Sequence, residues 1–318
     1  MNATDAAARV LHQRELPKIA YVPEELGRGS GQRPEQLLAG LATPTRGEIF
    51  DLDAGRWAGM PVLPVHPPFV MTTYRTPRGA AVDGDRPPSH TCGDGAVDGK
   101  AAGVMTELMV ASTHTGTHID ALCHITSGDR WFGAGVEREH LGDFGPLRAE
   151  ASSIPPFVCR GVLVDVPALR GVEALPAGEP VTADDVRAAL ARQRVELRAG
   201  DAVLVRTGYM SVWGEGGDRQ QAHYGAGVDL GAAELLADAG AVVVGSDTEN
   251  FECVPPPGGE DAFLPVHVEL LVKRGIHIVE LLYLEQLAAA GVSEFLFLCL
   301  SLRVRGATGS MVRPVAIA

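Results

Sequence analysis

Four side chains that can bind a metal ion or carry a proton lie within eleven residues of this sequence. They are His114, His118, Asp120 and His124, at offsets of 0, 4, 6 and 10. Imidazole nitrogens and carboxylate oxygens are ligands of divalent metals, and an imidazole can also transfer protons. A single histidine is more often an ordinary surface or core residue, and the alternative here is a polar turn without a metal. Three histidines and an aspartate in so short a segment favour a metal site.

The spacing of these residues predicts a bend in the backbone. A straight strand rises roughly 3.3 Å per residue, which would separate His114 from Asp120 by about 20 Å. Ligands of one metal must instead converge to roughly 2.0–2.2 Å from it. A regular helix also fails, because offset 6 points away from offsets 0 and 4. Gly116 can adopt the unusual dihedral angles that a bend needs. We therefore expect a strand end that turns into a short helical or irregular stretch.

Composition limits the classes of protein to which this chain can belong. Its 318 residues are 46% hydrophobic, which is enough for one large domain or two small ones. The net charge is −13, from 27 Lys and Arg against 40 Asp and Glu. Nucleic-acid binding and attachment to an anionic membrane both normally need a basic surface, so neither is expected. A small molecule is the expected partner.

Cysteine usage and hydropathy bear on the compartment. No run of 18 apolar residues occurs, and residues 1–18 are polar, unlike a signal peptide. The five cysteines are scattered along the chain and form no Cys-x-x-Cys pair. We therefore expect a cytoplasmic protein with reduced cysteines. Cys123 lies inside the histidine-rich segment, but its apolar neighbours favour a packing role over a nucleophilic one.

The elements that would position the segment alternate between strand and helix. Apolar runs predict strands at 49–52, 105–110, 161–166, 202–206, 241–245, 276–280 and 295–304. Helical patterns run over 182–193, 230–239 and 264–274, with Thr182 as an N-cap and with Gly240 and Gly275 as terminating residues. This alternation predicts an α/β fold.

Two stretches lie outside this regular pattern. Residues 1–45 read as an N-terminal arm in which Pro and Gly break any long helix. Residues 59–99 are rich in Pro, Gly and Asp and predict a long loop or a series of extended pieces. Long loops in compact enzymes often form lids or substrate walls, so we expect this one to shape a pocket.

Metal sites usually recruit ligands from distant parts of the chain, and two later segments qualify. Asp247 and Glu249 follow a buried strand, at the kind of strand end where α/β sites form. His267 opens an expected helix, and Glu280 ends the strand that follows it. For each residue the alternative is an ordinary cap or an exposed charge, and spacing alone leaves both interpretations open.

The segment His114-Thr-Gly-Thr-His118-Ile-Asp120 resembles the His-x-Gly-Thr-His-x-Asp signature of the putative cyclase family, which includes bacterial kynurenine formamidase and isatin hydrolase. Residues 49–52, 244–248, 278–280 and 306–315 resemble other parts of the family, so that the likeness covers about residues 48–318. It implies a compact α/β domain of the swivelling β/β/α type at 46–318, preceded by an arm at 1–45. It also implies a homodimer or homotetramer.

The resemblance further implies a division of roles among the site residues. One or two zinc or manganese ions would be held by His114, His118, Asp120, His267 and Glu280, with Asp120 bridging. His124 would be the catalytic general acid/base. Two departures bear on specificity: Leu122 stands where the family usually has Pro, and residues 1–45 and 60–100 are additional material. These insertions would rebuild the substrate pocket.

The function that follows is a metal-dependent hydrolase that opens a small amide, cyclic imide, lactam or lactone, or an N-formyl arylamine. Its attacking group would be a metal-activated water. The alternatives are a metal-dependent cyclase or dehydratase and a non-catalytic metal- or ligand-binding protein. Substrate-pocket candidates are Trp131 and Phe132, which closely follow His124, the Thr117 hydroxyl as an oxyanion donor, and Ser310 in the C-terminal region. Ordinary core packing is the alternative for the two aromatic residues.

Overall fold

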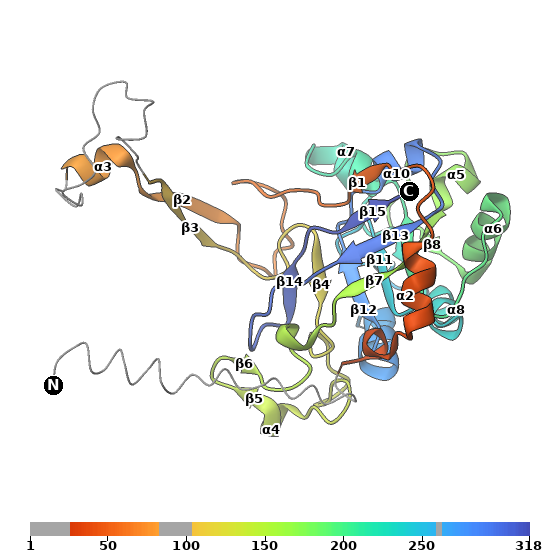
Figure 1. Cartoon of the computed structure of the whole chain (residues 1–318), viewed down its shortest axis with the longest axis horizontal. Coiled ribbons are helices and arrows are strands. Elements are labelled where there is room, and N and C mark those ends of the chain that lie inside the picture. The colour runs from red at the N-terminus through yellow and green to blue at the C-terminus, as the bar shows by residue number, and fades with distance from the viewer. Residues whose placement is uncertain (1–25, 83–103, 259–262) are drawn as a thin grey trace.

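A nine-stranded mixed sheet forms the centre of the molecule in the computed structural model, which describes residues 26–82, 104–258 and 263–318 (Figure 1). The strands lie in the order β1-β15-β13-β7-β9-β11-β12-β4-β14. Their bounds are β1 Ile49–Asp51, β4 His118–Asp120, β7 Phe157–Asp165, β9 Ala202–Arg206, β11 Val243–Ser246, β12 His277–Glu280, β13 Glu294–Cys299, β14 Gly309–Met311 and β15 Val315–Ile317. The four central strands, β7, β9, β11 and β12, are parallel, and antiparallel strands flank them on both sides.

Helices connect the parallel strands and cover the sheet. They are α5 Val166–Arg170, α6 Ala183–Gln193, α7 Gly217–Gln221, α8 Leu230–Asp238, α9 Pro265–His267 with the π-helix η5 Val268–Arg274, and α10 Glu285–Ala289. In α6 the Thr182 hydroxyl accepts a hydrogen bond from the Asp185 backbone N–H, and the Asp185 side chain caps in return, as a capping box does. The alternating α/β pattern expected from the sequence is confirmed.

The central strands are apolar because both of their faces are covered. Val203, Leu204 and Val205 of β9 are fully buried, as are Val243 and Val244 of β11. Parallel strands covered on both faces read as continuous apolar runs, which explains why the sequence pattern located them well. The strand expected at 295–304 ends earlier, at Cys299. The chain then turns outward, and Leu300 and Leu302 are exposed.

Short elements complete the described structure. The two-stranded pairs are β2 Val70–Arg75 with β3 Thr106–Val110, β5 Leu141–Gly142 with β6 Gly145–Pro146, and β8 Pro180–Val181 with β10 Gly227–Val228. The remaining helical pieces are η2 Arg28–Gly31, α2 Pro34–Leu41, α3 Pro77–Val82, α4 Glu137–His140, η3 Ala151–Ser153 and η4 Tyr209–Ser211. None of the helices in the described ranges combines the length and apolar character that crossing a bilayer requires.

The N-terminal residues that the structure describes lie against the sheet. The Arg28 backbone N–H donates to the Gly275 carbonyl at 2.8 Å. Helix α2 packs on β7, where Gly40 approaches so closely that a Cβ would lie 2.8 Å from the Arg160 backbone nitrogen. Residues 1–25 of the expected arm lie outside the described residues. The boundary between residues 45 and 46 remains a prediction.

The Pro-rich stretch contains more regular structure than a loop. Strands β2 and β3 form an antiparallel ribbon that projects from the body (Figure 1). All eleven residues of this β2–β3 ribbon are exposed. Helix α3 follows β2, and residues 83–103 lie outside the described part of the chain. Strand β3 runs toward the histidine-rich segment, as expected, but its pairing partner is β2 and not the central sheet.

Candidate metal centre

The bend in the histidine-rich segment lies between strand β3, which ends at Val110, and strand β4. Residues 113–117 form turns and bends, with Gly116 at φ 62°, and β4 then runs from His118 to Asp120. Arg56 holds this turn: its Nε donates to the Thr115 carbonyl at 2.9 Å, and its guanidinium also donates to the Thr117 carbonyl. The expected pivot at Gly116 is confirmed, and so is the expected strand end that turns into an irregular stretch; the short strand β4 after the bend was not expected.

Strand β4 presents His118 and Asp120 on one face, because alternate residues of a strand point the same way. Its neighbour β12 runs antiparallel and pairs Glu280 with His118. Directly opposed side chains lie close together, and here His118 Nε2 is 3.2 Å from Glu280 Oε2. The sheet register therefore places a late acidic residue against the early motif.

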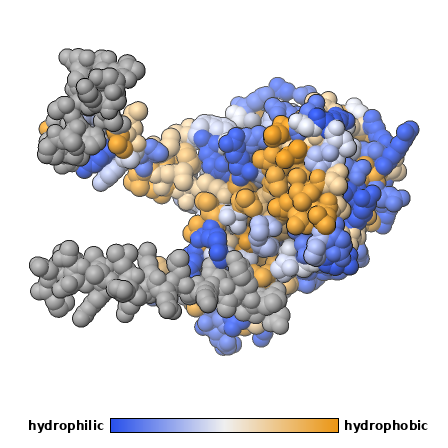
Figure 2. All heavy atoms as spheres, viewed as in Figure 1, coloured by the Kyte–Doolittle hydropathy of each residue, from blue (hydrophilic) through white to orange (hydrophobic). Residues whose placement is uncertain are grey.

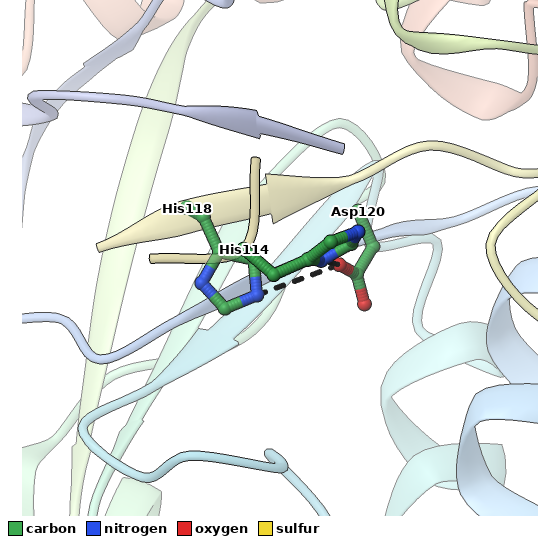
Figure 3. A group of neighbouring side chains, drawn as sticks. All are labelled: His114, His118 and Asp120. Atoms are coloured by element: carbon green, nitrogen blue, oxygen red, sulfur yellow. Dashed lines mark ion pairs between the residues drawn. The ribbon is translucent and has the colours of Figure 1, made fainter. Parts of the chain in front are cut away.

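His114 reaches the same place from the turn. Its Nδ1 lies 3.0 Å from Asp120 Oδ1, and His118 Nε2 lies 3.6 Å from the same oxygen (Figure 3). Gly309 of β14 makes room for the imidazole, because a Cβ at that position would lie 2.6 Å from Cε1 of His114. These three residues form one group whose ligand atoms lie within 4.8 Å of one another.

Asp120 is shared with a second group of possible ligands, which includes His267 and Glu280. His267 Nε2 lies 3.8 Å from Asp120 Oδ2 and 3.2 Å from Glu280 Oε1. The two carboxylate oxygens of Asp120 thus face different groups, as a bridging ligand requires. The structure brings together all five residues that were expected to bind metal.

The donor set fits a divalent cation. Asp120 is fully buried, and neither of its carboxylate oxygens receives a hydrogen bond within the described residues. The Nδ1 of His114 is likewise buried without a hydrogen-bond partner there. Unpartnered buried polar atoms are costly in a folded protein, and a cation held by them removes that cost. A mixed nitrogen and oxygen set suits zinc or manganese.

Electrostatics favour the charged carboxylate at the centre. Burial alone would raise the pKa of Asp120, but the positive charge that His124, His114 and His118 can carry holds that pKa well below its usual range. Burial alone would likewise lower the pKa of His267, but hydrogen bonds to Glu252 and Glu280 raise it to about 10. Without a metal, the second group therefore holds a proton between His267 and its acidic neighbours.

Each candidate ligand histidine has a partner on its other ring nitrogen. The Nδ1–H of His118 donates to the Gly116 carbonyl at 2.8 Å. The Nε2 of His114 forms a hydrogen bond of 2.9 Å with the Thr308 hydroxyl. Such partners fix the tautomer and the orientation of a ligating imidazole. The nitrogens that face Asp120 are thereby directed to where a metal would lie.

His124 lies beside this centre without belonging to either ligand group. It follows β4 in a turn in which its backbone N–H donates to the Ala121 carbonyl at 2.9 Å. Its ring centroid is 4.2 Å from that of His114. Burial lowers the pKa of His124 to about 4, which leaves the imidazole neutral and able to accept a proton at pH 7.

The candidate ligands open into a cavity of about 430 Å³, a size typical of small-molecule sites. His114, His118, His124, His267 and Glu280 all line it. Most of the remaining wall is apolar and is formed by residues 61–65, Ile125, Val254, Phe263, Leu264 and Leu281. The expectation that the Pro-rich stretch shapes a pocket is confirmed for residues 61–66, whereas residues 83–99 of that stretch fall outside the described ranges.

The four substrate-pocket candidates are not among the described residues that line this cavity. The Thr117 hydroxyl donates to the Leu281 carbonyl at 2.6 Å and accepts from the Ala54 N–H, so it fastens the motif to β12. The Ser310 hydroxyl accepts from the Leu302 N–H at 2.9 Å. Trp131 is buried, with its indole N–H donating to the Arg148 carbonyl, and Phe132 packs against Gly275. All four are thus engaged in packing or in hydrogen bonds with the backbone.

The structure adds residues that the sequence did not single out. His66 lines the cavity, and its ring stacks on His114 with centroids 5.2 Å apart. A lone histidine in a Pro-rich loop gave no signal of this position. Of the two acids after β11, Glu249 lines the cavity, and burial raises its pKa. Asp247 instead accepts hydrogen bonds from the backbone of Thr207 and Gly208, so it supports the scaffold.

Comparisons with known proteins identify a family and a fold. The model of the family described as "Putative cyclase" matches residues 50–253. A solved structure of a novel cyclase is 26% identical, with a TM-score of 0.78 over 92% of this chain and 96% of that chain. Isatin hydrolase A from Ralstonia solanacearum is 22% identical, with a TM-score of 0.60 over 88% of this chain and 95% of that one. No curated protein matches the chain significantly. The predicted cyclase-type α/β fold is confirmed.

Proposed function

Because the chain belongs to the putative cyclase family, we propose that it is a metal-dependent hydrolase acting on a small neutral carbonyl compound. One observation carries this proposal: the ligand atoms around the buried Asp120 carboxylate line an apolar cavity. A structural metal site is normally closed by four protein ligands, whereas a catalytic site keeps a position for water or substrate. Ligands that face a cavity of small-molecule size favour the catalytic kind.

The cavity indicates the chemical class of substrate. No Lys or Arg occurs among the described residues that line it, whereas Glu249 and Glu280 do. An anionic substrate would meet these carboxylates without a cationic side chain to pair with. The apolar wall suits a ring or an aryl group. We therefore favour a neutral lactam, cyclic imide or lactone, with an N-formyl arylamine as a second possibility.

The roles of the chain's own residues follow from their positions. A bound divalent ion would activate water and polarise the substrate carbonyl. His114, His118 and Asp120 would hold it, and His267 and Glu280 would hold a second ion that shares Asp120. The neutral imidazole of His124 would accept a proton from the attacking water and return it to the departing nitrogen or oxygen. Residues 61–66 would exclude bulk water from one side of the cavity.

The proposal is tested by metal analysis together with a substrate screen. The purified full-length chain would be stripped with chelator, reloaded with Zn²⁺ or Mn²⁺, and assayed for ring opening of lactams, imides and lactones and for deformylation of formanilides. Metal-dependent ring opening, absent in His118→Ala, supports the proposal. Turnover only in ring closure or dehydration would establish the cyclase alternative. Tight metal binding without turnover of any of these classes would indicate a non-catalytic protein.

A further inference from the structure

A buried carboxylate outside both ligand groups contacts one of the candidate ligands. Glu252 is 2% exposed, and its Oε1 accepts a hydrogen bond from Nδ1–H of His267 at 3.3 Å. Its Oε2 accepts the backbone N–H of Val266 at 2.7 Å. Both oxygens are therefore engaged with consecutive residues of the helical turn that carries His267.

The backbone of Glu252 is held firmly enough for it to position another residue. It forms a β-bridge with Val228, whose N–H donates to the Phe251 carbonyl at 3.0 Å. Gly227 lies so close that a Cβ there would be 2.5 Å from the Glu252 carbonyl carbon. The carboxylate thus projects from a fixed strand-like segment toward His267.

This arrangement distinguishes His267 from the other candidate ligand histidines. Within the described residues, His118 is oriented by a backbone carbonyl and His114 by a hydroxyl, and both of these partners are neutral. His267 is oriented by a carboxylate. A carboxylate keeps the proton on Nδ1, directs the Nε2 lone pair toward Asp120 and Glu280, and makes the imidazole a stronger base.

We propose that Glu252 is a positioning residue that sets the metal affinity of the group formed by Asp120, His267 and Glu280. The group formed by His114, His118 and Asp120 does not depend on it. The two groups then differ in metal affinity because of Glu252, which contacts a ligand without being one. This inference rests on the metal dependence contained in the proposed function, but it does not rest on any particular reaction.

The substitution Glu252→Gln separates the positioning role from simple loss of packing. A Gln side chain has one acceptor oxygen, whereas Val266 N–H and His267 Nδ1–H are two donors. If the amide oxygen faces Val266, the amide N–H₂ faces His267 Nδ1 and favours the tautomer whose Nε2 carries a proton. That tautomer has no lone pair available for a metal. The volume of the side chain is nearly unchanged.

The test is a titration of the metal-free, full-length protein with Mn²⁺. Calorimetry measures the affinity of each ion, and electron paramagnetic resonance detects magnetic coupling between the two ions. We expect the natural protein to bind two ions per chain, with the magnetic coupling of a close pair. In Glu252→Gln, the affinity of one ion should fall about 10–100-fold and the coupling should disappear at moderate Mn²⁺, while the other affinity stays within about threefold. Glu252→Asp, which keeps the charge on a shorter side chain, should fall between the two.

Glu269→Gln is the matched control, because Glu269 is a buried carboxylate on the same helical segment that pairs with Lys273 and Arg274. It should bind both ions like the natural protein. The proposal is overturned if Glu252→Gln binds two ions normally, if both affinities fall together, or if the natural protein binds only one ion. The titration uses no substrate, so its result stands even if the protein proves not to be a hydrolase. A negative result for Glu252 would likewise leave the proposed hydrolase activity open to its own test.

Discussion

At the scale of single residues, the centre separates binding from proton transfer. Asp120 is fully buried and faces three imidazoles. The ring of His124 lies next to that of His114, with centroids 4.2 Å apart, but His124 belongs to neither ligand group. The lowered pKa of His124 keeps its imidazole neutral at pH 7, and the raised pKa of His267 reflects a proton that a metal would displace. Each of these differences leads to a measurable expectation.

We expect His124→Ala to retain its metal but to lose about 10²–10⁴-fold in kcat, because positioned proton transfer contributes that much. His118→Ala should instead lose the metal itself, since His118 lies against both Asp120 and Glu280. Metal content and kcat measured on the same preparations distinguish the two variants. A metal-loaded His124→Ala with full activity would remove the proton-transfer role.

The metal-free protein should lose stability as the pH rises. The folded pKa of His267, about 10, lies above its ordinary value of 6.5. The stabilisation from this proton is therefore complete below pH 6.5 and is lost as the pH rises toward 10. Thermal unfolding in the presence of chelator, from pH 6.5 to 10, should show a falling midpoint. His267→Gln should show a shallower fall, and equal slopes in both proteins would contradict this origin.

At the scale of elements, the site depends on the register of short strands at one side of the sheet. Strand β4 has three residues, and its pairing with β12 places His118 opposite Glu280. Its pairing with β14 places Asp120 opposite Gly309. Arg56, from the segment after β1, holds the turn that precedes β4. No single element forms the centre, which requires all of them in register.

Gly309→Ala tests this dependence on the elements. The added Cβ would lie 2.6 Å from Cε1 and 3.0 Å from Nδ1 of His114, so the ring must shift, and the nitrogen that faces Asp120 must shift with it. Overpacking of this kind costs about 1–3 kcal/mol, which leaves the domain folded. We expect a small drop in the melting temperature together with a large loss of metal affinity. The control Gly231→Ala, in helix α8, adds a Cβ that meets no tight contact; it should leave metal affinity unchanged and should not lower the melting temperature. Unchanged metal binding in Gly309→Ala would contradict the expected displacement.

At the scale of the whole molecule, the β2–β3 ribbon exposes more apolar surface than an isolated chain would be expected to leave in water. Figure 2 shows apolar side chains along it. Val70, Leu108 and Val110 on one face and Met71 and Met109 on the other are each about half exposed. A two-stranded ribbon alone is marginally stable in water. We propose a homodimer or homotetramer in which this ribbon is buried between copies, which would account for its composition.

Light scattering should therefore give a mass two or four times that of the single chain, 33.4 kDa. Replacing Leu108 and Val110 together by Lys should shift the protein toward the single-chain mass, because charges on that face oppose its burial. Val172→Lys, at an exposed apolar residue outside the ribbon, is the control. A natural protein that is already monomeric at micromolar concentration would contradict the expected assembly.

The sequence by itself determined the parts of this protein that local physics specifies. Apolar runs located the buried parallel strands, Thr182 and Gly275 marked the ends of helices, and Gly116 marked the bend. The five metal-ligand candidates followed from the motif and from its resemblance to a family. The spacing favoured His114, His118 and Asp120, whereas it left His267 and Glu280 open, and only the resemblance implied those two.

Only the tertiary structure decided how distant residues meet. Sequence spacing could not show that β4 pairs with β12 and β14, because register depends on contacts among strands separated by more than a hundred residues. For the same reason it placed Thr117 and Ser310 in the pocket, although both hydroxyls are engaged by the backbone. His66, Arg56 and Glu252 became visible only in the fold, because each acts through a neighbour that is remote or irregular in sequence.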